Sequence, residues 1–302
     1  MRNSRDAHCS NAYVAIWRLQ NLRHITVIDD GDGIPSKMHD LVFEPRVTSK
    51  LDTSHIDAWG LHGRGMALYS IATNAKSARV VNSDTHKGCA IEVCADLNRL
   101  PEKADQSSFP TFELGENGVV NVRGPKNLLR TICEFALQSR SQCNVYVGSP
   151  AEICASLYTN GVHDLSVVER LFCDDIMSLP VTKRLAVCST PSEFAEQAAS
   201  LGLPISDRTA RRILDETIKD VPKILDRITL TSPADKSKPK KKRTSRNGSI
   251  FKLTEDEKKM LADSAMAGFS SVAPAYYLNT SVEPEVVVNS DRLVVSIPLV
   301  RL

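Results

Sequence analysis

The chain has 302 residues, enough for one large domain or two to three small ones, and its formal net charge is only +2. This balance excludes a global positive field directed at nucleic acid, so any basic surface must be local. Hydrophobic residues make up 42% and charged residues 25%, ordinary values for a globular protein, no apolar run approaches the ~20 residues of a membrane helix, and the start is polar. We expect a cytoplasmic protein without a membrane segment.

The first part of the chain, residues 1–98, has the pattern of a compact α/β unit. Residues 3–10 contain the end of a helix, and the Asp- and Gly-rich segment 29–35 is a turn by composition. Residues 36–59 are polar with few periodic signals, which indicates a mobile segment, and residues 66–74 predict a helix. Apolar or alternating runs predict strands over residues 12–18, 24–28, 78–82 and 89–94.

Polar residues 99–117 predict a linker, and a second α/β segment is expected over residues 110–163. Its helix, over residues 125–138, is expected to open with proline in the first turn. Ser149 and Glu152 have the spacing of a capping box after a strand, so we interpret them as a βα turn with a helix cap rather than a second ligand site. The strands of this segment are expected at residues 119–122 and 144–147.

The remainder of the chain is expected to be helical over residues 164–231, followed by a basic linker over residues 232–249. The C-terminal segment, residues 250–302, predicts a helix and a hairpin. The helix is expected over residues 254–267, and the hairpin strands at 286–288 and 293–299.

Eight cysteines are scattered along the chain without a Cys-x-x-Cys pair. This spacing argues against a zinc site and favours reduced, buried thiols. The residues are Cys9, Cys89, Cys94, Cys133, Cys143, Cys154, Cys173 and Cys188.

Two glycine-rich clusters carry the strongest functional signal. Asp29, Gly31 and Gly33 follow a predicted strand, and a second cluster over residues 60–66 precedes a predicted helix. A carboxylate at a strand end can accept a hydrogen bond from an exocyclic adenine amine, and neighbouring glycines let the backbone approach the flat base. A glycine-rich loop before a helix offers free N–H groups to phosphates. The segment 36–59 between them would then act as a lid.

These motifs resemble those of the GHKL ATPases, which include gyrase B subunits, mismatch-repair ATPases, heat-shock chaperones and sensor histidine kinases. The resemblance covers residues 1–95. The sequence Asn-Ser-Arg-Asp-Ala at residues 3–7 is similar to the end of the family's first box, Asp29-x-Gly31-x-Gly33 to the second, and residues 60–66 to the third. The resemblance implies a Bergerat-type α+β sandwich that binds ATP and Mg²⁺.

Site roles follow from the resemblance residue by residue. Asn3 would ligate Mg²⁺, and Asp29 would bind adenine with space provided by Gly33. Lys50 would approach the phosphates from the lid. Further nucleotide contacts would come from Asp6, Ala7, Gly31, Gly60, Gly63, Arg64, Gly65 and Met66.

Two departures from the family pattern bear on turnover. The family's general base is a glutamate four residues before the Mg²⁺ asparagine, and that position lies before Met1. Either the true start is upstream, which we favour, or the protein binds ATP without hydrolysing it efficiently; for the chain as given we expect very slow turnover and assign no catalytic residue. Many relatives also carry threonine where this chain has Cys89 after Gly88, and a thiol is a weaker hydrogen-bond partner for the adenine aspartate.

Residues 192–214 resemble a helix-turn-helix, with Arg211 and Arg212 on the second helix. The turn is about two residues longer than usual for this motif, and an ordinary helical hairpin is the alternative. The basic run 238–246 would add attraction to phosphates or remain a solvated linker.

Three functions therefore remain open. The first is an ATP-driven conformational switch, with a homodimer as a possible assembly. The second is a nucleotide-sensing regulator that binds DNA through residues 192–214 and 238–246. A histidine kinase is the third, although the nucleotide domain of that family ends the chain, whereas here about two hundred residues follow it.

Overall fold

The computed structural model divides into two compact units, Met1–Ser237 and Lys238–Leu302, which are described separately. Strand β9 of the segment expected over residues 110–163 belongs to the same sheet as the first two strands of the chain. The structure describes residues 1–47, 55–57, 60–62, 66–102, 105–114, 120–231, 254–276, 278–282, 284–288 and 293–300.

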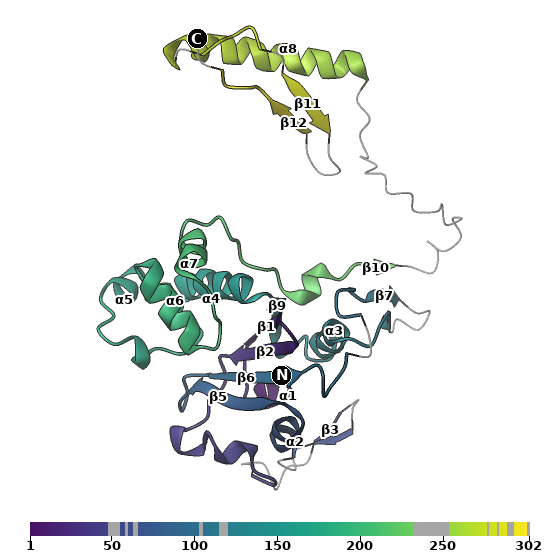
Figure 1. Cartoon of the computed structure of the whole chain (residues 1–302), viewed down its shortest axis with the longest axis vertical. Helices are drawn as coiled ribbons and strands as arrows, with labels where there is room; N and C mark the ends of the chain where they lie inside the picture. The colour runs from purple at the N-terminus through teal and green to yellow at the C-terminus, as the bar shows by residue number, and fades with distance from the viewer. Residues whose placement is uncertain are drawn as a thin grey trace. The chain divides into compact units, whose positions relative to one another are not determined.

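A mixed five-stranded sheet forms the centre of the first unit (Figure 1). Its order is β5 (Ser77–Ser83), β6 (Cys89–Asp96), β2 (Leu22–Asp29), β1 (Asn11–Leu19) and β9 (Asn144–Gly148). Neighbouring strands are antiparallel except β9, which runs parallel to β1. The prediction of an α/β fold is confirmed at this level, and every strand predicted for this sheet is present.

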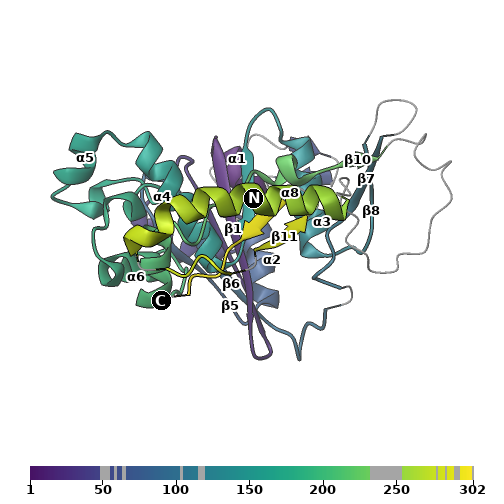
Figure 2. The same cartoon turned by 90° about the horizontal axis from the view of Figure 1, so that it is seen from above.

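Strand periodicity separates the side chains of this sheet into two faces. The α1 face contains Ala12, Val14, Val27, Asp29, Cys89 and Val145. The α4 face contains Tyr13, Ala15, Thr26, Ile28, Ala90 and Tyr146. Each apolar face packs against its own set of helices, so the sheet is the middle layer of three, with α4 and α6 on one side and α3 on the other (Figure 2).

The α4 face is covered by α4 (Pro150–Asp164), α6 (Pro191–Ser200), α7 (Asp207–Leu214) and the 3₁₀ turn η4 (Arg184–Val187). Tyr13 stacks on Tyr146 with ring centroids 4.8 Å apart, and Asn160 Nδ2 donates to the Tyr13 hydroxyl at 2.8 Å. The Thr26 hydroxyl donates to the carbonyl of Gly202 at 2.8 Å. This bond fixes the turn between α6 and α7 to the sheet.

The α1 face packs against α3 (Leu128–Gln138) and the buried ring of Phe112. Helix α1 (Arg2–Asp6) lies at the C-terminal end of β2, where Ser4 is buried and Cys9 joins the same apolar cluster. Helix α2 (Ala67–Asn74) packs beside β5 and β6 and exposes most of its surface. The short hairpin β3 (His55–Asp57) and β4 (Gly60–His62) precedes α2.

Two sequence predictions for residues 99–138 were wrong. The expected linker contains β7 (Thr111–Leu114), which pairs with β8 (Val120–Arg123) and, in parallel, with β10 (Leu230–Thr231). Helix α3 begins at Leu128 rather than at Pro125 because the Asn127 side chain caps it, accepting from the Arg130 N–H at 2.8 Å.

The region 164–231 is only partly helical. It contains α5 (Val167–Leu171), α6, α7, short 3₁₀ turns and β10. Pro180, Pro191, Pro204 and Pro222 interrupt this region, and a proline lacks the N–H that a continuous helix needs. The capping box predicted at Ser149 and Glu152 is confirmed at the start of α4.

The second unit consists of α8 (Glu255–Val272), the 3₁₀ turn η7 (Ala273–Tyr276) and the antiparallel hairpin β11 (Glu285–Val288) and β12 (Leu293–Ser296). Thr254 and Glu257 form a capping box at the start of α8. The helix continues past residue 267 because one glycine, Gly268, costs only about 1 kcal/mol inside a helix. Among the helices described, none has the length and apolarity to cross a bilayer.

Candidate functional site

The carboxylate of Asp29 is the central group of the site. Asp29 ends β2, and the residue is only 5% exposed. Its Oδ1 accepts from the Gly31 N–H at 3.1 Å, and the hydroxyl of the buried Ser4 on α1 hydrogen-bonds the same carboxylate. The Asp29 carboxylate is therefore held between the end of β2, helix α1 and the turn that contains Gly31.

Burial raises the pKa of Asp29, because the charged form loses hydration, while the bonds from Ser4 and Gly31 lower it and only partly offset that cost. A carboxylate has lone pairs for about four hydrogen bonds. A ligand that brought an additional N–H donor to Asp29 would therefore relieve a real energetic cost.

The glycines beside Asp29 are needed for backbone packing. A Cβ on Gly31 would lie 2.6 Å from the carbonyl oxygen of Ala7, and one on Gly33 would lie 1.9 Å from that of Asp84. Gly33 also has φ +74°, which favours glycine. The space that these glycines leave free is thus filled by the α1 terminus and by the β5–β6 hairpin.

The β5–β6 hairpin supports the turn from the other side. The Ser83 hydroxyl donates to the Gly88 carbonyl at 2.8 Å and accepts from the Ile34 N–H at 2.7 Å. Cys89 lies directly opposite Asp29 in the β2–β6 register, and burial together with Asp29 raises the pKa of its thiol to about 12. The thiol stays protonated at neutral pH, so it presents no second negative charge to Asp29.

Helix α1 brings the other predicted residues of the first box to the same place. The Asp32 N–H donates to the Ala7 carbonyl at 2.9 Å, and Asp6 is paired with Arg5 at 3.1 Å. Asn3, the predicted Mg²⁺ ligand, is exposed on α1. Asn3, Asp6, Ala7, Asp29, Gly31 and Gly33 therefore belong to one continuous region.

The second glycine cluster is only partly described. Gly60 begins β4, and Met66 is the exposed N-cap residue of α2. The predicted phosphate contacts Lys50, Gly63, Arg64 and Gly65 lie outside the described residues. The convergence of both clusters on one nucleotide therefore stays a prediction.

Ser4 is a site residue that was not predicted from the sequence. The available signal was helical spacing, because residues three apart share a helix face and Ala7 was already placed at the pocket. A buried hydroxyl on that face must find a partner, and Asp29 provides it.

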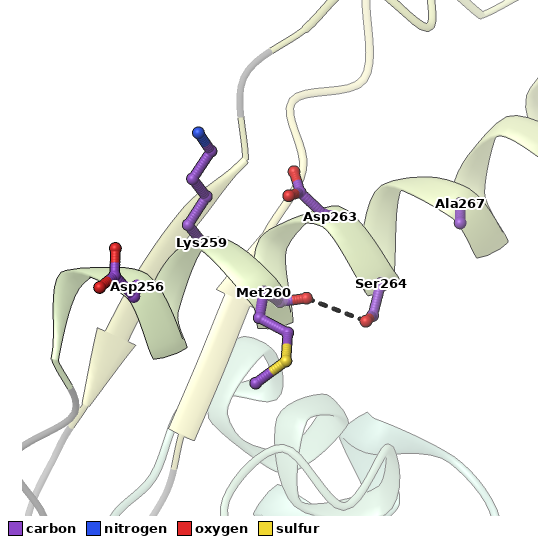
Figure 3. A pocket seen from close by; sticks show the side chains of 6 residues that line it. All are labelled: Asp256, Lys259, Met260, Asp263, Ser264 and Ala267. Atoms are coloured by element: carbon purple, nitrogen blue, oxygen red, sulfur yellow. Dashed lines mark hydrogen bonds between the residues drawn. The ribbon is translucent and has the colours of Figure 1, made fainter.

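Two other features do not add to this site. Within the described residues, no group of three or more His, Cys, Asp or Glu side chains is arranged to hold a metal ion. The shallow hollow in Figure 3 lies along a single helix, α8, and the only hydrogen bond drawn there joins Ser264 to the backbone of Met260 at 2.9 Å. Its lining comprises Asp256, Lys259, Met260, Asp263, Ser264 and Ala267.

The predicted helix-turn-helix segment is a pair of helices, α6 and α7, in contact with each other. Ala210 and Ile213 of α7 are buried in the α4-face core, whereas Arg208, Arg211 and Arg212 are exposed. The three arginines thus point away from the core.

Comparison with known proteins adds no family assignment: no protein-family model matches the chain, and no curated protein matches it.

Proposed function

We propose that the first unit is a GHKL-type nucleotide-binding domain of Bergerat fold that takes ATP with Mg²⁺ and acts as an ATP-dependent conformational switch. Asp29 binds the adenine amine, Asn3 ligates Mg²⁺, and Asp6 and Ala7 line the base pocket. Lys50 and the cluster Gly60, Gly63, Arg64, Gly65 and Met66 contact the phosphates. Closure of residues 36–59 over the nucleotide, with formation of a homodimer, is the output of the switch.

The observation that carries this proposal is the buried carboxylate of Asp29 beneath α1. Burial makes its charged form costly, and the bonds from Ser4 and Gly31 together with the nearby Met1 ammonium offset this cost only in part. Neighbouring Asp30 shows the contrast: its carboxylate accepts from the Ser10 and Asn11 N–H groups at 2.7 and 2.9 Å and from the Asn11 amide at 2.9 Å. Asp30 therefore has a structural role, while Asp29 keeps acceptor capacity for a ligand.

Competition binding tests the proposal. A fluorescent ATP analogue with Mg²⁺ should bind the full chain and be displaced by ATP and ADP much better than by GTP, because a 6-keto group offers no donor to Asp29. Asp29→Asn replaces a charge-assisted hydrogen bond of about 1.5–3 kcal/mol, which corresponds to a loss of about 10- to 100-fold in affinity.

The matched control is Asp32→Asn, on the same turn. The Asp32 carboxylate is 54% exposed and pairs with His8 at 2.9 Å, so its loss should leave nucleotide affinity within about twofold. Equal displacement by ATP and GTP, or equal affinity loss in both variants, would refute the assignment of Asp29 to the base.

As a second candidate function, we propose that α7 binds the phosphate backbone of duplex DNA, with residues 238–246 as an auxiliary basic segment. The outward position of Arg208, Arg211 and Arg212 favours this function. The fixed turn at Gly202 would hold α7 rigidly relative to the sheet.

Salt-dependent duplex binding tests this second function. The double variant Arg211→Ala/Arg212→Ala should weaken binding and reduce the slope of log K against log salt by about 2, since each lost phosphate contact contributes about 0.9. Glu196→Ala on the exposed surface of α6 is the control and should not reduce the slope. An unchanged slope in the arginine variant would exclude α7 as the DNA contact.

A further inference from the structure

We propose that Cys9 and Cys143 are a site of oxidative modification, at which a peroxide converts the two thiols into a disulfide beside the Asp29 turn. Their Sγ atoms lie 3.1 Å apart, although 134 residues separate them in the chain. Both residues are buried, at 2% and 3% exposure. A small relative movement of the two side chains would bring the sulfurs to the ~2.05 Å of a disulfide.

The two cysteines lie where the chain enters two paired strands. Cys9 follows α1 and precedes β1, and Cys143 precedes β9. Hydrogen bonds already hold these entrances together, because the Asn144 N–H donates to the Ser10 carbonyl at 2.8 Å and the Asn144 side-chain amide donates to Asn11 Oδ1 at 3.1 Å. The sulfurs are therefore positioned by the sheet itself.

The hydrogen bond between the thiols makes them chemically unequal. It lowers the pKa of Cys143 and raises that of Cys9, whose burial adds to the effect. Since the thiolate is the nucleophile, Cys143 is the sulfur expected to react first. No other cysteine pair among the described residues has its sulfurs in a hydrogen bond with each other.

The reaction balances with a peroxide as the oxidant. The Cys143 thiolate attacks the peroxide, an S–O bond forms as the O–O bond breaks, and the released alkoxide or hydroxide takes up a proton. The Cys9 sulfur then attacks the sulfenic sulfur of Cys143. An S–S bond forms, the S–O bond breaks, and water leaves with the Cys9 proton, so two thiols are oxidised by two electrons and the peroxide is reduced.

This modification would act on the proposed nucleotide site. Asp29 lies close enough to raise the pKa of Cys9 electrostatically, and Ser10, next to Cys9, donates to Asp30 in the same turn. A disulfide would fix the chain between α1 and β1, which carries Ala7 and thus the contact with Gly31. This effect on nucleotide binding, unlike the cross-link itself, rests on the proposed function.

Peptide mapping of the peroxide-treated full chain tests the proposal. We expect loss of two free thiols, reversed by dithiothreitol, and a cross-linked pair of peptides containing Cys9 and Cys143. Trypsin leaves Cys143 and Cys154 in one peptide, because no lysine or arginine lies between them, so the mapping uses Cys154→Ala. Cys9→Ser and Cys143→Ser should each abolish the cross-link. Cys133→Ser, which changes another buried cysteine of the same cluster, should not.

Cys173, the least buried cysteine, serves as the internal measure of oxidant exposure. Absence of the cross-link at doses that oxidise Cys173, or its formation only in urea, would overturn the proposal. Saturating Mg-ATP at 10 Kd should slow cross-linking about 10-fold if the reacting state must open the site. A cross-link unaffected by ATP, in a chain shown by calorimetry to bind ATP, would refute the coupling between the thiols and the nucleotide site while the thiol pair stands.

Discussion

The two faces of the central sheet differ in the side chains that they bury. The α4 face is closed by three helices and η4 around a mainly apolar cluster, and the buried guanidinium of Arg184 in η4 donates to the backbone carbonyls of Leu179 and Met177. The α1 face is equally well packed beneath α3 but ends in a buried carboxylate whose pKa is raised by burial. Apolar burial stabilises the fold, whereas a desolvated charge weakens it and is typical of a functional position.

The comparison between the faces implies that stability and ligand binding can be changed separately. Substitutions on the α4 face should lower the free energy of unfolding and leave binding by the folded chain unchanged. Substitutions around Asp29 should lower nucleotide affinity, either with an unchanged free energy of unfolding or together with a loss of stability.

Phe194→Ala on α6 is expected to have the largest effect on stability. Phe194 is fully buried in the α4-face core, and its ring packs edge-on against Tyr158 with the ring centroids 5.8 Å apart. Removing a buried phenylalanine ring costs about 3–5 kcal/mol. Urea unfolding should show this loss, and calorimetric nucleotide affinity, measured below the transition, should stay within about twofold. A large affinity change would mean that the two faces are coupled.

Gly31→Ala should affect stability and binding together. The new methyl group would meet the Ala7 carbonyl at 2.6 Å and the Asp29 carboxylate at 3.1 Å, so α1 must move away from the turn. Overpacking of this kind costs about 1–3 kcal/mol. The control is Gly268→Ala in α8, where a Cβ meets nothing within 4 Å and the helix should gain about 0.5–1 kcal/mol. Urea unfolding measures the stability of both variants, and calorimetry measures the nucleotide affinity of Gly31→Ala. An unchanged free energy of unfolding in Gly31→Ala would contradict the packing of α1 on this turn.

The pH dependence of stability should show the smallest effect. Because burial raises the pKa of Asp29 above 3.8, the folded chain keeps this proton to a higher pH than the unfolded chain. The raised pKa of Asp29 therefore contributes its full stabilisation below pH 3.8, the unfolded pKa. This stabilisation is lost as the pH rises through the pKa of Asp29 in the folded chain. The wild type should therefore lose stability relative to Asp29→Asn over that range, by about 1.4 kcal/mol for each pH unit that separates the folded and unfolded pKa values. Parallel curves for the two proteins would contradict a desolvated Asp29.

The sequence predicted the strands of the sheet well because their apolar alternation is a local signal. The partner of β9 was not predictable, since its parallel pairing with β1 joins residues 11–15 to residues 144–148. Strand β10 has only two residues, Leu230 and Thr231, too few for any periodicity. Its pairing with β7 depends on the tertiary fold.

At the site, the sequence correctly indicated that Asp29 ends a strand followed by a glycine turn. The reason for the glycines was not predictable, because Gly31 and Gly33 are required by backbone segments from α1 and from the β5–β6 hairpin. The contact between Cys9 and Cys143 was likewise invisible, since the two cysteines approach only when β9 joins the sheet.

Isothermal titration calorimetry of the full chain and of Asp29→Asn with Mg-ATP measures whether the Asp29 carboxylate binds an adenine nucleotide. We expect one binding site in the wild type and a loss of about 10- to 100-fold in affinity in the variant. Circular dichroism should show that both proteins are folded. Absence of binding heat in the folded wild type, or equal affinities in the two proteins, would contradict the claim that Asp29 binds an adenine nucleotide.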